Sequence, residues 1–299
     1  MHRSLAPVDH LAVGYLLLSG LCLVPQVGDG GVHAWVLAGH LGAAVAILGL
    51  RRVDGSRSPH RALRELYPIL LLLVFYLEVD LLARAVHDPP GYDALVRSWD
   101  ALLFGAHPHV VLAQHLDGRL WRELFHGLYV SYYLLLIGSF VGVWWTAPDQ
   151  FARFAFVVTG MFVSFLLVFV AFPVAGPLTA PDVSIMTNGW FPQLVAWIYV
   201  PIQINGITTG AFPSSHVGMS VGIACLLAPR RWTWRCLLWG LVVGISVSTT
   251  YGRFHYAIDA VAGLAAGVLL YLLWTALYSV LQKRENGSAV RSARAVRSL

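Results

Sequence analysis

The stretch ARFAFVVTGMFVSFLLVFVAFPVA, residues 152–175, has Arg153 as its only charged residue. About 20 apolar residues are enough for a helix to cross the hydrocarbon core of a bilayer, which is about 30 Å thick. A soluble domain carries about 25% charged residues, whereas this chain of 299 residues is 12% charged and 58% hydrophobic. The composition therefore excludes a water-soluble globular domain and predicts an integral membrane protein.

Apolar runs of similar length recur along the chain, and we expect an all-α, polytopic transmembrane helical bundle of about eight spans. The predicted spans are 8–26, 33–50, 67–86, 124–146, 152–175, 213–228, 235–252 and 256–281. The first run is long and no small-x-small cleavage site ends it, so we interpret it as a retained span. Cys22, Cys225 and Cys236 show neither metal-ligand nor disulfide spacing. We expect a single membrane domain over residues 1–282.

The basic residues predict the orientation of the chain. They cluster in the second predicted loop, the sixth predicted loop and the tail, as Arg51, Arg52, Arg57, Arg61 and Arg64, then Arg230, Arg231 and Arg235, then Lys283, Arg284, Arg291, Arg294 and Arg297. Basic loops stay on the cytoplasmic side, so an even number of spans places both termini in the cytoplasm. Residues 283–299 are expected to be a basic, disordered cytoplasmic tail. Because the charge lies in loops, it does not indicate a nucleic-acid partner.

Two predicted outer segments are too long for simple turns. The first, 87–123, mixes apolar and acidic residues and predicts interfacial amphipathic helices. The second, 173–212, is rich in proline and glycine, and its aromatic residues suit the headgroup layer.

The first polar cluster is GAFPSSHVGMS, residues 210–220. Pro213 suits the first position of a helix, which would put Ser214, Ser215 and His216 in the first turn. Free N–H groups and the dipole make a helix N-terminus an anion site, and the hydroxyls and the imidazole add groups that bind phosphate. A serine cap with an interfacial histidine is the structural alternative.

The second polar cluster is STTYGRFHYAIDAVAG, residues 248–263. His255 and Asp259 are four residues apart, which places them on one face of a helix. A carboxylate so placed can accept the N–H of one ring nitrogen and leave the other nitrogen free as nucleophile or base. Arg253 offers a planar fork of donors for phosphoryl oxygens. The alternative is an interfacial salt bridge between Asp259 and Arg253, although ionisable groups in membrane helices are usually functional.

Both clusters fall at the outer ends of neighbouring predicted spans, so their side chains can converge at the extracytoplasmic interface. Two histidines suit a two-step displacement. One attacks phosphorus and becomes a phosphohistidine, and the other protonates the leaving oxygen and then activates the acceptor. Arginine and helix N–H groups would stabilise the charge. The expected substrates are membrane lipids, as both donor and acceptor.

These motifs resemble the signatures of the type 2 phosphatidic acid phosphatase superfamily. Residues 213–216 are similar to its P-S-G-H signature, and residues 255–259 to the H-x-x-x-D of its third signature. The likeness is closer to the branch that holds inositol phosphorylceramide synthases, whose F-P-S-x-H and S-T-x-Y-x-x-x-H-Y-x-x-D-x-x-A-G patterns match residues 212–216 and 248–263. AFPVAGP, residues 171–177, is similar to the proline-rich stretch of that branch.

The resemblance covers about residues 120–281, which we take as the catalytic core. It implies a His-His-Asp triad that needs no metal or other cofactor. His255 would be the nucleophile, Asp259 would orient it, and His216 would be the acid and base. Ser214 and the Ser215 backbone would hold phosphate.

The chain departs from the superfamily in lacking the first signature, K-x6-R-P. Arg253 is our first candidate for the missing positive charge, although it lies two residues before the histidine and not six. Arg84 and Arg122 are second candidates, and Arg84 could instead pair with Asp80 within one helix. Further residues that could line the site are His126, Tyr129 and Tyr251.

The predicted function is transfer of a phospho-headgroup, such as phosphoinositol, from a lipid donor to a lipid alcohol. The same site hydrolyses lipid phosphates when water is the acceptor, so exclusion of water decides between the two reactions. The resemblance favours transfer. Alternatives from other classes are a transporter or scaffold, which internal repeats would support, and a metal site built by His216, His255 and Asp259. A serine hydrolase is disfavoured because no G-x-S-x-G motif occurs.

Overall fold

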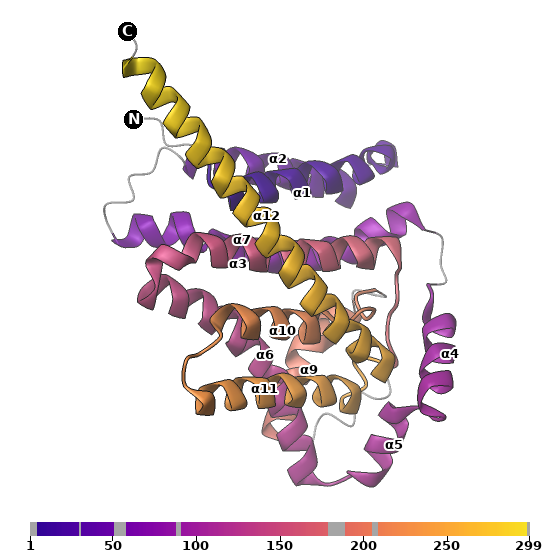
Figure 1. Cartoon of the computed structure of the whole chain (residues 1–299). Helices are drawn as coiled ribbons and strands as arrows, with labels where there is room; N and C mark the ends of the chain where they lie inside the picture. The colour runs from indigo at the N-terminus through magenta and orange to yellow at the C-terminus, as the bar shows by residue number, and fades with distance from the viewer. Residues whose placement is uncertain are drawn as a thin grey trace.

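A computed structural model of the chain describes residues 5–29, 31–50, 58–87, 91–178, 189–204 and 209–297. These residues form a bundle of α-helices, and none of them lies in a β-strand (Figure 1). The all-α class is as expected from the sequence. Arg51, Arg52 and Arg57, predicted to be in a cytoplasmic loop, lie outside the described residues.

A helix occurs at each of the predicted spans. These helices are α1 (Pro7–Leu23), α2 (Val32–Leu50), α3 (Ser58–Val86), α6 (Arg119–Thr146), α7 (Pro148–Ala171), α10 (Ser215–Leu227), α11 (Trp232–Tyr251) and α12 (Ala257–Arg297). Shorter elements lie between them, namely the 3-10 helix η1 (Val24–Asp29), α4 (Asp93–Phe104), α5 (Pro108–His115) and α9 (Trp190–Ile204).

Not all of these helices are long and apolar enough to cross a membrane. In the described part of the chain, 5 segments qualify by length and composition, namely Pro7–Gly28, Val32–Leu50, Arg119–Thr146, Pro148–Ala171 and Ala257–Arg284. α10 is apolar but has 13 residues, and at about 1.5 Å per residue it is shorter than the hydrocarbon core. α3 carries several charged residues, and α11 begins with the stretch WTWRC. The expectation of about eight spans therefore exceeds the number of helices that qualify.

α7 lies at the centre of the bundle. It begins with Pro148 at its first position, where the missing N–H is not needed. It packs against α1, α3, α6, α10 and α12. Its phenylalanines, among them Phe154, Phe165 and Phe169, are buried in the main hydrophobic core. The helices that carry the two polar motifs, α10 and α12, are thus held against a rigid apolar centre.

α4 and α5 lie at the end of the bundle opposite to the C-terminal end of α12 (Figure 1). α4 buries Val96 and Asp100 and leaves Leu102 and Leu103 exposed, and it ends at Gly105, whose φ of 67° suits a left-handed helix cap. The expected helices of the segment 87–123 are therefore present, with one face docked on the protein.

α12 continues as one helix to Arg297, whereas the sequence predicts a disordered tail from residue 283. The segment contains no proline and is rich in alanine and arginine, which are favourable in helices. The prediction of a disordered tail rested on the absence of hydrophobic periodicity from this segment. Helix propensity is a separate signal, and it accounts for the difference.

Candidate functional site

Ser214 is the N-cap of α10, and Ser215 and His216 occupy its first turn. The Ser214 hydroxyl oxygen accepts a weak hydrogen bond from the Val217 N–H at 3.5 Å. Pro213 lies one residue before the cap, so the prediction that it opens the helix is wrong by two positions. The physical reason is that serine is a far better cap than phenylalanine, the residue that a helix starting at Pro213 would use. Ser214, Ser215 and His216 nevertheless lie together at the start of the helix.

Glycines bring the two motifs together. A Cβ on Gly263 of α12 would lie 2.5 Å from the carbonyl oxygen of Ser214, and a Cβ on Gly267 would lie 2.6 Å from that of Gly218. The Ser214 N–H also donates to the Asp259 carbonyl at 2.9 Å. α10 and α12 are therefore in backbone contact at the ends that carry the polar residues, which the sequence predicted only to converge.

The His255 ring is oriented mainly by the backbone. Its Nδ1 lies 2.7 Å from the carbonyl oxygen of Ala211 and 3.5 Å from Oδ2 of Asp259. Because a carbonyl can only accept, Nδ1 carries the proton and Nε2 keeps a free lone pair. Asp259 Oδ2 also accepts the Tyr256 N–H at 2.8 Å, which caps α12. The carboxylate thus lies near the histidine as predicted, but the carbonyl is its closer partner.

The stretch 171–177 positions that carbonyl. The carbonyl of Val174 accepts the Ala211 N–H at 2.9 Å. The carboxylate of Asp93, at the start of α4, accepts the N–H groups of Ala175 and Gly176 at 3.0 and 2.9 Å. Gly176 has a φ of 89° and its Cα faces the Phe254 carbonyl, where a Cβ would lie at 2.6 Å. The stretch that resembles the proline-rich motif therefore contacts Ala211, whose carbonyl binds the His255 ring, and Phe254, which precedes His255 in the chain.

His216 faces His255, with ring centroids 5.7 Å apart and ring planes at 68°. Its Nε2 lies 3.0 Å from the Tyr129 hydroxyl, so Tyr129 is at the site. Its Nδ1 is buried and has no hydrogen-bond partner in the described ranges. The Tyr132 ring lies 4.4 Å from the imidazole. Sequence reasoning missed Tyr132, although it lies three residues after Tyr129 and so on the same face of α6.

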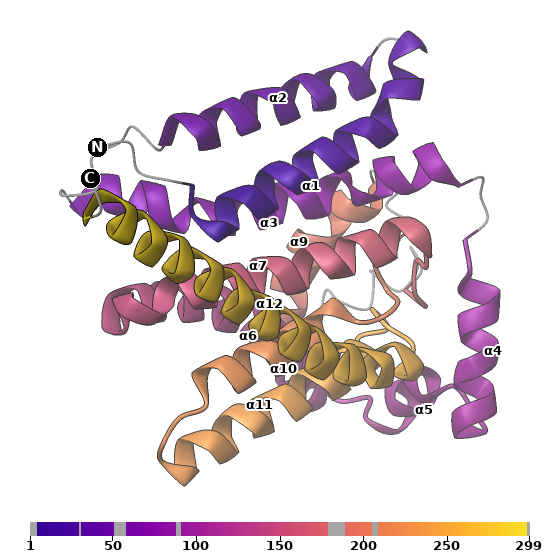
Figure 2. The same ribbon diagram turned by 45° about the horizontal axis from the view of Figure 1, so that its top comes forward.

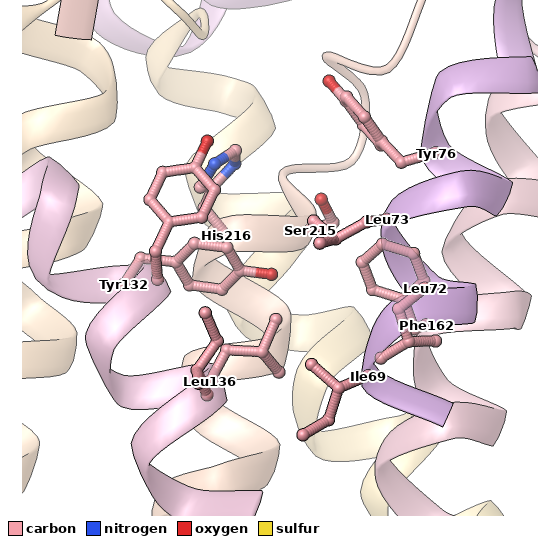
Figure 3. A pocket seen from close by; sticks show the side chains of 11 residues that line it. Ile69, Leu72, Leu73, Tyr76, Tyr132, Leu136, Phe162, Ser215 and His216 are labelled. Carbon is pink, nitrogen blue, oxygen red and sulfur yellow. The ribbon is translucent and has the colours of Figure 1, made fainter. Parts of the chain in front are cut away.

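An apolar pocket opens beside His216, between α3, α6, α7 and α10 (Figure 3). Tyr132, Leu136 and His216 lie on one side of it and face Ile69, Leu72, Leu73 and Tyr76 of α3 across the space. Ser215 and Phe162 also line it, and it encloses about 560 Å³ including its mouth. A pocket with hydrocarbon walls and a few polar groups at one end suits a molecule that has an apolar tail and a polar head.

A third polar cluster, which sequence reasoning missed, covers the start of α12 and consists of Asp100, His107 and His109. Asp100 of α4 is fully buried, and its Oδ1 accepts the Ile258 N–H in the first turn of α12 at 3.0 Å. Its Oδ2 lies 3.6 Å from Nδ1 of His107. The His109 ring packs edge-on against Tyr256 at 5.6 Å. Burial, opposed by the Asp100 carboxylate, lowers the pKa of His109. No local sequence pattern links Asp100 to a helix more than 150 residues away.

The predicted arginines differ in their surroundings. Arg253 has a left-handed φ of 60°. Burial and His107 lower the pKa of His109, and the charge of Arg253 lowers it further, so Arg253 lies near the third polar cluster. Arg84 pairs with Asp80 at 2.7 Å within α3, which is the alternative that the sequence offered. Arg122 pairs with Asp117. Arg84 and Arg122 are therefore engaged within their own segments.

The other candidate lining residues support the site from behind. His126 Nδ1 donates to the Arg122 carbonyl at 2.8 Å, and its ring faces Tyr251 and Phe254 edge-on. The Tyr251 hydroxyl donates to the Leu116 carbonyl at 3.0 Å, which ties α11 to the end of α5. No group of three or more His, Cys, Asp or Glu side chains in the described part of the chain is arranged to hold a metal ion.

Comparison with known proteins identifies the family of the chain. A family model described as the PAP2 superfamily matches residues 95–273, which include α6 to α11, both polar motifs and the first half of α12. No curated protein matches the chain, and no solved structure matches it. The family match covers more than half of the 299 residues. This integral membrane chain therefore belongs to the PAP2 superfamily of phosphatases and phosphotransferases.

Proposed function

We propose that the protein is a membrane lipid phosphotransferase that moves a phospho-headgroup from a lipid donor to a lipid alcohol through a phosphohistidine. The observation that carries the proposal is that two histidines from separate motifs face each other at 5.7 Å, at a helix N-terminus and beside an apolar pocket. The helix N-terminus suits the phosphate, and the pocket suits the chain of the lipid.

In the first step, His255 Nε2 attacks phosphorus, and the bond between phosphorus and the donor lipid oxygen breaks. The Nδ1–H stays bonded to the Ala211 carbonyl at 2.7 Å, so the attacking nitrogen is the unprotonated one. The ring becomes positively charged as the N–P bond forms. The Asp259 carboxylate, 3.5 Å from Nδ1, stabilises that charge in a buried environment.

His216 moves the protons. The acid is the imidazolium form of His216, whose Nε2–H donates to the Tyr129 hydroxyl oxygen and whose Nδ1–H protonates the leaving lipid oxygen, which leaves a neutral imidazole. The deprotonated Nδ1 then takes the proton of the acceptor hydroxyl, whose oxygen attacks phosphorus and breaks the N–P bond. Both histidines return to their starting state, so each turnover needs only the two lipids.

The phosphate oxygens would lie at the first turn of α10. The N–H groups there have no partner within the helix. The Ser214 oxygen accepts from Val217, which leaves the hydroxyl hydrogen for a phosphate oxygen. Ser215 lines the pocket and can contribute in the same way. Arg253 is the arginine that we propose for the remaining charge.

Transfer is favoured over hydrolysis because the reacting groups are shielded from water. Asp259 is fully buried and His255 is 2% exposed. A dry site protects a phosphohistidine from water until an alcohol arrives. The resemblance of both motifs to the inositol phosphorylceramide synthase branch supports phosphoinositol as the transferred group. Superfamily membership equally accommodates a lipid phosphate phosphatase, which is the second candidate.

We place the site at the extracytoplasmic interface, with both termini in the cytoplasm. The arginine clusters support this orientation. Figure 2 shows the C-terminal end of α12 at one end of the bundle and α4 and α5 at the other, in agreement with Figure 1. The start of α12, which carries Asp259, lies at the α4 end.

The decisive experiment supplies purified protein in lipid nanodiscs with headgroup-labelled phosphatidylinositol, together with ceramide or diacylglycerol, with a chelator present. A second reaction contains labelled phosphatidic acid. His255→Ala tests the nucleophile, and His115→Ala, an exposed histidine on α5, is the matched control.

A new labelled lipid that disappears only in His255→Ala supports the transferase and names its acceptor. Release of free phosphoinositol or phosphate alone makes the protein a hydrolase. Equal turnover by the wild type and His255→Ala overturns the mechanism.

A further inference from the structure

A second buried pair of titratable groups lies outside the family match, in the three N-terminal helices. Nε2 of His40 on α2 lies 2.5 Å from Oε2 of Glu78 on α3, and both side chains are 6% exposed. The Ser19 hydroxyl of α1 lies 3.4 Å from the other ring nitrogen of His40. Ionisable side chains within apolar helices are rare and usually mark a binding or transport site. The phosphotransfer mechanism uses none of these residues.

The pair leaves polar atoms unsatisfied. Oε1 of Glu78 is buried and has no hydrogen-bond partner among the residues that the structure describes. The hydroxyl of Tyr15 on α1 is buried beside the Glu78 carboxylate and interacts with it without reaching the distance and angle of a regular hydrogen bond. Buried carboxylate oxygens and hydroxyls are normally paired, because desolvation without a partner is unfavourable. The arrangement therefore fits a ligand that donates a hydrogen bond to Glu78.

A cavity opens at this pair. Apolar side chains of α1, α2 and α3 form its walls, among them Leu16, Val36 and Phe75, and His40 and Glu78 are the polar residues among those that line it. The cavity encloses about 830 Å³ including its mouth. It is separate from the pocket at His216, because the two sets of lining residues do not overlap.

α3 separates the two spaces. Leu72, Leu73 and Tyr76 face the pocket at His216, whereas Leu71, Val74 and Phe75 line the cavity at Glu78. α1 packs against both α2 and α3 and closes the cavity from a third direction. A ligand in this cavity would therefore occupy a site of its own and would not displace the lipid beside His216.

We propose that this cavity binds a lipid alcohol, with the chain along the apolar walls and the hydroxyl donating to Oε1 of Glu78. A neutral donor fits best, because His40 already pairs with the carboxylate and leaves no charge for an ammonium group. An anionic headgroup could only accept hydrogen bonds, and Oε1 of Glu78 is itself an acceptor, so the pair offers it no partner. This site does not depend on the transferase proposal, since its binding can be measured without turnover.

The test uses the full-length protein in phosphatidylcholine nanodiscs and two photoreactive probes, a long-chain alcohol with a diazirine in the chain and the methyl ether of the same alcohol. Labelled peptides are quantified by mass spectrometry. We expect the alcohol to label α1, α2 and α3 about fivefold more than the ether, as one hydrogen bond would give. Glu78→Leu should abolish this preference, and Glu78→Gln, which keeps an acceptor oxygen, should retain part of it.

Glu65→Gln is the matched control, because Glu65 lies on α3 but lines neither space. It should keep the wild-type preference. If Glu78→Leu does not fold, displacement of the label from wild-type protein by excess unlabelled alcohol, but not by its methyl ether, still supports the site. Equal labelling by alcohol and ether, or preferential labelling of α6 and α10 in place of the N-terminal helices, overturns the proposal.

Discussion

Replacing Gly263 by alanine tests whether the contact between α10 and α12 sets the geometry of the site. A Cβ at this position would lie 2.5 Å from the Ser214 carbonyl oxygen and 3.2 Å from the Ser214 Cβ. Ordinary contact begins at 3.4 Å, so the two helices must separate by about 0.9 Å. The obstacle is backbone, which has no rotamer that could move it aside.

The expected result of that shift is a large loss of rate with a folded protein. The hydrogen bond from the Ser214 N–H to the Asp259 carbonyl is 2.9 Å long and would exceed bonding distance after the shift. His216 would move with α10, away from His255 on the other side of the contact. A misplacement of about 1 Å lowers turnover by about 100-fold. We expect kcat to fall by about that factor.

Initial rates of labelled lipid formation and of phosphatidate hydrolysis, measured in nanodiscs, would report the effect. Circular dichroism and size-exclusion chromatography would establish that the variant is folded. Gly240→Ala is the matched control, because Gly240 lies on α11 with nothing within 4 Å of the new methyl group. It should keep the wild-type rate. Wild-type turnover by Gly263→Ala, or an equal loss in Gly240→Ala, would refute the reasoning.

Three further predictions follow from contacts of single side chains. Tyr129→Phe removes the 3.0 Å contact with His216 Nε2 and keeps the ring, so we expect kcat to fall about fivefold, with a small loss of thermal stability because the buried ring nitrogen is left unpaired; an unchanged kcat would contradict the role given to this hydroxyl. Arg84→Gln should keep activity within about twofold in the same assay, because Arg84 is half-exposed and pairs with Asp80 of its own helix; a loss above tenfold would return Arg84 to the site. Burial lowers the pKa of His109 below 6.5, so the unfolded chain binds its proton more readily, and stability should fall as the pH drops below about 6.5. Thermal unfolding between pH 5 and 7.5 should show a smaller loss in His109→Gln, and an identical pH dependence in both proteins would contradict this.

The parts of the fold that sequence could predict are those with a local signal. Runs of apolar residues mark the helices, because a segment in the membrane must satisfy its backbone hydrogen bonds internally, and a helix does so. Boundaries were less predictable where two signals compete. At the start of α10 the proline suggested one first residue and the serine cap decided another. Beyond residue 283 helix propensity continued α12 after the hydrophobic signal had ended.

The site divides along the same line between local and distant contacts. His255 and Asp259 are four residues apart on one helix, so their proximity could be predicted from spacing alone. The closer partner of His255 is the carbonyl of Ala211, which is 44 residues away and has no side-chain signature. A motif of side chains therefore identified the histidine and its carboxylate but not the backbone group that fixes the tautomer.

The acidic residues of α3 show why distance in sequence matters more than residue type. Glu78 and Asp80 both lie in one apolar run. Residues that are two positions apart on a helix point to different sides of it. Asp80 finds Arg84 one turn further along, which spacing predicts. Glu78 pairs with His40, which is 38 residues away on another helix, so no pattern within α3 could reveal this pair. A buried charge without a local partner thus points to a contact between helices, and in this protein that contact is where the second cavity opens.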